Sequence, residues 1–129
     1  MDDFVNCPHS RNTEVKLEDV LKHPELQVLA KSDEAGVLLV LNEYGSGSQV
    51  FIQGHPEYDR MTLSNEYHRD VAKGLNPSLP KNYFNDNDPF SRPVLSWRNF
   101  SNTLYGNWLN FYVYQNTPYE LSNNFDWVI

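Results

Sequence analysis

The chain has 129 residues, a formal net charge of −7 and a single cysteine. This length suits one domain, and the acidic charge repels phosphate backbones and anionic membranes, which disfavours nucleic-acid binding. One cysteine cannot form an internal disulfide, no apolar run approaches the roughly 20 residues of a transmembrane helix, and the acidic N-terminus MDDFVNCPHS lacks the pattern of a signal peptide. We therefore expect a cytoplasmic protein.

The first part of the chain predicts a short helix and three strands. Apolar residues in 17–22 favour a helix, which Pro24 ends. Strands are expected at 26–30, 37–42 and 50–53, separated by the turn clusters SDEAG and EYGSGS. Such short connections favour antiparallel neighbours.

The second part predicts two main helices joined by an irregular loop. The segment DRMTLSNEYHRDVAKGLNP has helical apolar spacing, with Asp59 or Thr62 to cap its start and Gly74 to close its end. Residues 76–93 are rich in Pro, Asn and Asp, and their aromatic side chains favour an ordered loop over a free linker. A helix with an aromatic face is expected at 96–115. The tail SNNFDWVI shows no clear pattern.

His55 and Glu57 directly follow the third expected strand, in the stretch FIQGHPEYD. Residues i and i+2 of an extended segment point to the same side, and Pro56 restricts the backbone between them. Both side chains are then able to face one cavity, as the base-and-orienter pair that activates a nucleophile. The alternative is a histidine at the end of a strand beside a solvated glutamate, because short motifs often match by chance.

The sequence offers no metal site and one candidate nucleophile. The four histidines show neither HxH nor HxxxH spacing and have no cysteine pair beside them. Cys7 is the only thiol, but it precedes Pro8 in an irregular stretch without the small residues that a nucleophile elbow needs. We therefore interpret Cys7 as a half-buried residue beside the site.

Five motifs, in order over residues 8–121, resemble the homoserine O-succinyltransferase family, which includes homoserine O-acetyltransferases. They are PHSR, GHPEYD, TLSNEYHRDVAKGLNP, PKNYFNDNDP and SWRNFSNTLYGNWLNFYVYQNTPYEL. The resemblance implies an α/β fold: the C-terminal part of a flavodoxin-like, class I glutamine amidotransferase-like fold, with short antiparallel strands followed by two main helices. Residues 1–129 are then expected to form a single partial domain.

The resemblance also implies a reaction and a set of site residues. In that family an acyl group passes from succinyl-CoA or acetyl-CoA to an enzyme cysteine, and then to the hydroxyl of L-homoserine in methionine biosynthesis. His55 matches the catalytic base and Glu57 its orienting partner, while Ser10, Arg69 and Glu66 match substrate-binding residues. No bound cofactor or metal is expected. Taken alone, Arg69 reads as an exposed arginine paired with Glu66 on the same helix, and Ser10 as an ordinary loop hydroxyl.

No segment of the chain matches the nucleophile elbow of the family. We therefore expect the C-terminal half of an acyltransferase, without activity of its own, because removal of a nucleophile costs a factor of about 10⁶. Exposed apolar surface would favour a homodimer or association with an N-terminal half. A non-catalytic remnant or interaction module, and part of a glutamine amidotransferase-like hydrolase, remain as alternatives. The donor, succinyl or acetyl, and the acceptor, homoserine or serine, are left open.

Overall fold

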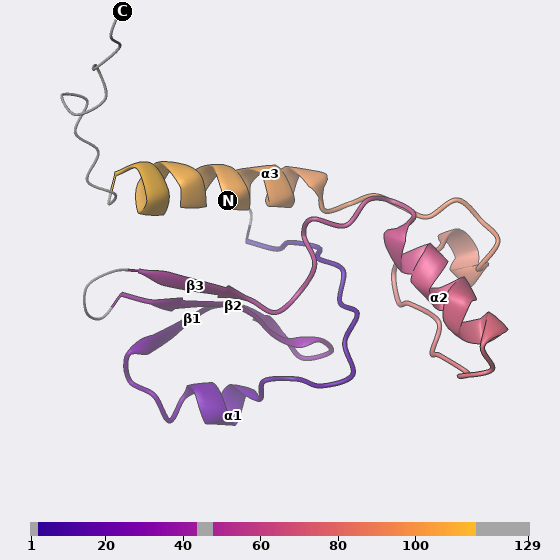
Figure 1. The fold of residues 1–129 in the computed structure, drawn as a ribbon, viewed down its shortest axis with the longest axis horizontal. Coiled ribbons are helices and arrows are strands. Elements are labelled where there is room, and N and C mark those ends of the chain that lie inside the picture. Colours follow the sequence, from indigo (N-terminus) through magenta and orange to yellow (C-terminus); the bar gives the residue numbers. More distant parts are fainter. Residues whose placement is uncertain (1–2, 44–47, 116–129) are drawn as a thin grey trace, which may run out of the picture.

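The computed structural model describes residues 3–43 and 48–115. Short antiparallel strands come first and two main helices follow, so the expected α/β arrangement is confirmed (Figure 1). The elements are α1 (Leu17–Val20), β1 (Leu26–Ser32), β2 (Gly36–Asn42), β3 (Gln49–Ile52), α2 (Thr62–Ala72), the 3₁₀ turn η1 (Asn85–Asn87), α3 (Arg98–Asn107) and the π-helical turn η2 (Trp108–Tyr114).

The three strands form one antiparallel sheet in the order β1-β2-β3. The central strand β2 has the sequence GVLLVLN, and its residues 37–41 are all buried. A strand that is apolar at every position suits burial on both faces. Helix α1 covers one face of the sheet with Val20, and α3 lies along the other with Phe100 and Leu104 (Figure 1). Strand β2 is therefore the centre of the main core.

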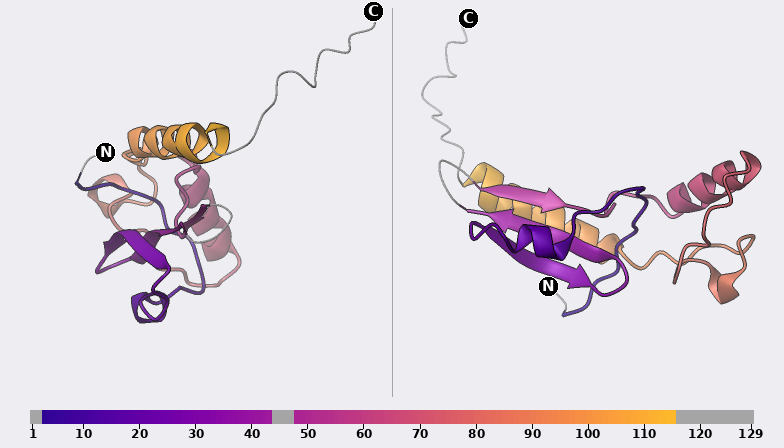
Figure 2. Two further views of the ribbon diagram at one scale, coloured as in Figure 1. Left: turned by 90° about the vertical axis from the view of Figure 1, so that its left-hand side faces the viewer. Right: turned by 90° about the horizontal axis from the view of Figure 1, so that it is seen from below.

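Helix α2 and the loop after it pack around a second, aromatic core. Tyr83, Phe84 and Trp97 are buried there, and both α2 and the loop lie apart from the sheet (Figure 2). The loop is ordered, as predicted. Its backbone conformation explains why it is rich in Asn and Asp. Four of them, at positions 76, 82, 86 and 87, have positive φ, a conformation that Asn and Asp tolerate better than other side chains.

The ends of the helices differ in part from the predictions. Gly74 has φ +72° and the N–H of Leu75 donates to the carbonyl of Asp70, so the predicted glycine closure of α2 is confirmed. The predicted cap at the start of α2 is wrong, because Met61 occupies the N-cap and no side chain bonds there. The last helix is not regular over its length, since it changes to π geometry at Trp108. The tail lies outside the described residues.

Candidate active site

Backbone hydrogen bonds fix the segment that carries the histidine–glutamate pair. The N–H of Gln53 donates to the carbonyl of Leu38, which extends the pairing of β3 with β2 by one residue. The N–H of His55 then donates to the carbonyl of Pro8 at 2.7 Å. The N-terminal segment 3–11 is thereby held against the end of β3, although it is more than forty residues away in sequence.

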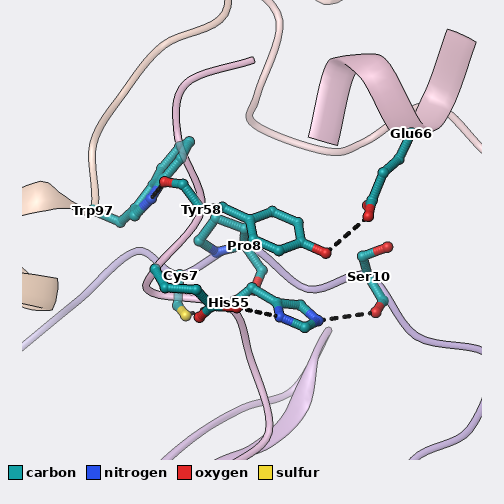
Figure 3. A network of polar contacts seen from close by, with 8 residues as sticks. Cys7, Pro8, Ser10, His55, Tyr58, Glu66 and Trp97 are labelled. Atoms are coloured by element: carbon teal, nitrogen blue, oxygen red, sulfur yellow. Dashed lines mark hydrogen bonds and ion pairs between the residues drawn. The ribbon is translucent and has the colours of Figure 1, made fainter. Parts of the chain in front are cut away.

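The side chains of His55 and Glu57 form a hydrogen-bonded pair. Nδ1 of His55 lies 2.8 Å from Oε1 of Glu57, and Nε2 lies 3.2 Å from the backbone carbonyl of Ser10 (Figure 3). The His55 side chain is 34% exposed, so it is open to a reactant. Carboxylate and carbonyl oxygens only accept, so both contacts are hydrogen bonds when both ring nitrogens carry a proton. When the ring is neutral with its proton on Nδ1, donated to Glu57, Nε2 is the basic nitrogen and does not bond the Ser10 carbonyl.

The backbone between the pair is a turn, and the expected extended segment is wrong. Pro56 and Glu57 occupy the turn, and the N–H of Tyr58 donates to the carbonyl of His55 at 3.2 Å. The turn brings the Tyr58 ring onto the imidazole, with centroids 4.3 Å apart and planes inclined by 17°. Tyr58 is a contact of the base that the sequence argument missed; its only signal was its place three residues after His55 in GHPEYD.

Glu66 extends from α2 to the ring of Tyr58 that stacks on His55. The hydroxyl of Tyr58 donates to Oε1 of Glu66 at 2.9 Å, while Oε2 of Glu66 is buried and has no hydrogen-bond partner among the described residues (Figure 3). A buried carboxylate oxygen without a donor is costly. The structure therefore brings Glu66, Ser10 and the His55–Glu57 pair together through Tyr58.

Arg69 forms its hydrogen bond outside that cluster. Its side chain is 54% exposed, and Nε donates to Oδ1 of Asp70 at 2.8 Å. The interpretation that pairs Arg69 with Glu66 is therefore wrong, since the ion pair of Arg69 is with Asp70. The contact with Asp70 raises the pKa of Arg69 most, and the charges of Glu66 and Tyr58 act in the same direction. Within the described part of the chain, Arg69 makes no hydrogen bond to His55 or Glu57.

The thiol of Cys7 lies beside the site, half-buried as predicted. Its Sγ donates to the carbonyl of Pro8 at 3.7 Å. Burial is the largest influence on its pKa, which rises to about 12, and the negative charge of Glu57 acts in the same direction. The thiol is therefore protonated near neutral pH, whereas a nucleophilic cysteine needs its thiolate.

The other two polar residues of PHSR, His9 and Arg11, make no hydrogen bond to the side chain of His55 among the described residues. Arg11 donates from Nη2 to the carbonyl of Ala35, which ties the N-terminal segment to the β1–β2 turn. His9 is half-buried, and burial lowers its pKa, followed by repulsion from Arg11 and His55. Its imidazole is therefore biased toward the neutral form.

No cluster of three or more His, Cys, Asp or Glu side chains able to hold a metal ion occurs in residues 3–43 and 48–115. The helices in this part of the chain are all too short or too polar to span a membrane.

An open groove of about 1300 Å³ runs between the N-terminal segment, the sheet and α3. Its apolar lining includes Leu39, Phe100, Leu104 and Trp108.

The His55–Glu57 pair follows β3, a half-exposed edge strand and not a buried one. A solvent-accessible histidine oriented by a glutamate is typical of enzymes that activate a nucleophile. Comparison with known proteins narrows this class. A model of the family described as homoserine O-succinyltransferase matches residues 1–119. The chain belongs to that family.

Curated relatives are named either homoserine O-acetyltransferase or homoserine O-succinyltransferase. The homoserine O-acetyltransferase of Agathobacter rectalis is 57% identical over 95% of this chain and 39% of its own length. That of Lachnoclostridium phytofermentans is 58% identical over 93% of this chain and 39% of its own length. The homoserine O-succinyltransferase of a Shewanella species (strain W3-18-1) is 52% identical over 95% of this chain and 38% of its own length. The chain thus spans about two fifths of the length of these relatives.

Proposed function

We propose that this chain supplies the base and the amino-acid-binding residues of a homoserine O-acyltransferase. The enzyme would transfer a succinyl or acetyl group from acyl-CoA to the hydroxyl of L-homoserine, a step of methionine biosynthesis. The observation that carries the proposal is the 2.8 Å contact between Nδ1 of His55 and Oε1 of Glu57, in a chain that belongs to this family.

The pair supports a role in proton transfer. With its Nδ1 proton donated to Glu57, His55 accepts the homoserine hydroxyl proton at Nε2 while the oxygen attacks the acyl thioester carbonyl. The carbon–sulfur bond then breaks, and the sulfur leaves as a thiolate. In the neutral form of His55, Nε2 carries no proton to donate to the Ser10 carbonyl, so its lone pair is available to the substrate hydroxyl. A positioned general base contributes about 10²- to 10⁴-fold in rate.

The thioester sulfur is proposed to come from outside this chain. Cys7 is unsuited to the role because its pKa is raised to about 12 by burial. The chain spans only about two fifths of its relatives, so the remaining length has room for a nucleophile. We also propose that the chain is part of a flavodoxin-like, class I glutamine amidotransferase-like fold.

Substrate recognition is assigned to three residues. Glu66 has a carboxylate oxygen without a partner among the described residues, which suits the α-ammonium group of an amino acid. Arg69 has a planar guanidinium suited to the α-carboxylate, and its exposed bond to Asp70 can be exchanged at little cost. Ser10 already contacts the base through its carbonyl, so its hydroxyl lies close to where the substrate would react.

The groove between the sheet and α3 is the proposed binding surface for the polypeptide that would complete the enzyme. Apolar side chains in its lining at Phe4, Leu29 and Trp108 are 92%, 48% and 41% exposed, respectively. Burial of such surface favours association by roughly 25 cal/mol per Å². We propose that a polypeptide equivalent to the unmatched part of the relatives covers this groove, and that a second copy of the chain takes its place when that polypeptide is missing.

The test combines the 129-residue chain with the unmatched segment of the Agathobacter rectalis relative. We expect O-acylhomoserine only from the combination. His55→Ala should then lower turnover by 10²-fold or more, whereas His23→Ala, a change at an exposed histidine, should leave it unaltered. Equal turnover in both variants would contradict the proposed role of His55.

A further inference from the structure

Tyr58 joins the two halves of the site. One face of its ring stacks on the imidazole of His55 at 4.3 Å, and its hydroxyl donates to Oε1 of Glu66 at 2.9 Å. His55 lies at the end of β3 and Glu66 lies on α2, so no backbone pairing connects them directly (Figure 3). The side chain of Tyr58 contacts both His55 and Glu66.

The backbone of Tyr58 is fixed on both sides of its own residue. Its N–H donates to the carbonyl of His55, and its carbonyl accepts a hydrogen bond from Nε1 of Trp97 at 2.9 Å. Trp97 is only 4% exposed and belongs to the aromatic core under α2. The ring therefore projects from a rigid turn that is anchored to the core of the α2 region.

The phenol is held as a hydrogen-bond donor. Burial raises the pKa of Tyr58, and the hydrogen bond to Glu66 raises it further, with an opposing contribution from Ser10. A protonated phenol donates one hydrogen bond, and Oε1 of Glu66 accepts it. This contact holds Oε1 of Glu66 and leaves Oε2, which has no partner in the described part of the chain, for another donor.

We propose that Tyr58 is a positioning residue with two separable contacts: its ring holds the imidazole of His55, and its hydroxyl orients Glu66 toward the α-ammonium group of the amino-acid substrate. The inference rests on the proposed function and adds a residue to it. Preorganised groups gain their effect because their geometry is set before the substrate binds.

The ring contact is tested by NMR on the 129-residue chain without any ligand. A stacked aromatic ring shifts the carbon-bound protons of His55 upfield. Tyr58→Phe keeps the ring and should keep that shift, whereas Tyr58→Leu should lose it. If the His55 protons have the same shifts in the leucine variant as in the wild type, the stacking half of the inference is overturned.

The hydroxyl contact is tested by NMR titration with L-homoserine. Tyr58→Phe should weaken binding by about tenfold, since it removes a hydrogen bond to a charged group. Tyr67→Phe, a neighbouring change on α2 where the ring packs against Phe84, serves as the matched control and should bind as the wild type does. For 4-hydroxybutyrate, which lacks the ammonium group, the wild type and Tyr58→Phe should bind equally.

A double-mutant cycle separates positioning from a general structural role. In a Glu66→Gln background, Tyr58→Phe should cost little further affinity for homoserine, because the group that it orients has lost its charge. Independent, additive losses would overturn the inference while leaving the proposed function intact. A wild-type chain that does not bind homoserine would overturn the substrate assignment, and the inference with it.

Discussion

Gly54 lies so close to Cys7 that a Cβ atom at position 54 would stand 2.7 Å from Sγ. The same Cβ would lie 3.0 Å from the carbonyl oxygen of Pro8, which accepts the N–H of His55. The absence of a side chain at position 54 thus lets the N-terminal segment approach the end of β3 and support the turn that holds the base.

Gly54→Ala should therefore destabilise the fold. We expect a loss of about 1–3 kcal/mol in the free energy of unfolding, the usual cost of overpacking, measured by chemical denaturation. Gly106→Ala is the matched control, because a Cβ there meets no atom within 4 Å and alanine favours a helix. Equal stability of the two variants would contradict the close approach at position 54.

Cys7 should react slowly with thiol reagents at neutral pH. Burial raises the pKa of this thiol to about 12, so the reactive thiolate is scarce until strongly alkaline pH. Labelling by iodoacetamide between pH 7 and 10 should be much slower in the folded chain than in urea. Folded and unfolded chains that react at the same rate would refute the raised pKa.

The same shift links stability to pH. The folded-state pKa lies above the ordinary cysteine value of 9.0, so Cys7 contributes stability that is fully present below pH 9 and is lost as the pH rises toward 12. Cys7→Ala should show a smaller decline in stability over that range than the wild type. Parallel declines in denaturation midpoints would show that other groups account for the loss.

Tyr83 should be important for the stability of the region around α2. Its hydroxyl accepts the N–H of Ser64 at 3.0 Å and donates to the carbonyl of Arg60, and both Tyr83 and Ser64 are 3% exposed. Tyr83→Phe leaves a buried N–H without its acceptor and should cost about 1–3 kcal/mol. Tyr114→Phe, at a residue 71% exposed, should change stability by less than about 0.5 kcal/mol. Thermal denaturation of both variants provides the comparison.

The parts of the fold set by local pattern could be predicted from the sequence. Apolar runs and short turn clusters predict the three strands and their antiparallel pairing, and Gly74 predicts the end of α2. The proximity of His55 and Glu57 was also expected, although a turn brings them together and not an extended strand. In these cases the determining groups lie within a few residues of each other.

The parts that depend on distant contacts could not be predicted. The carbonyl of Ser10 meets Nε2 of His55 across 45 residues, and Glu66 bonds Tyr58 from a helix whose orientation is set by the aromatic core. Helical spacing alone predicted an ion pair between Glu66 and Arg69, because no local pattern indicates that the hydroxyl of Tyr58 bonds Glu66. The family resemblance identified Ser10 and Glu66 as candidates but gave no geometry for them.

Arg69 provides a test of substrate recognition that is independent of folding. Its side chain is exposed and its bond to Asp70 is a surface contact, so Arg69→Ala should leave stability within about 0.5 kcal/mol of the wild type. Homoserine binding should fall by tenfold or more if the guanidinium pairs with the α-carboxylate. Arg92→Ala, also at an exposed arginine, is the control for loss of positive charge. Similar affinities in the two variants would exclude Arg69 from the binding site.

The central claim, that this chain provides the base of an acyltransferase, is tested most directly by single-turnover acyl transfer to homoserine. The preformed acyl-enzyme of the combined polypeptides is mixed with homoserine, and O-acylhomoserine is measured over time. We predict that His55→Ala slows this step by 10²-fold or more and that Glu57→Gln slows it by a smaller factor. Deacylation at the wild-type rate in His55→Ala would contradict the account.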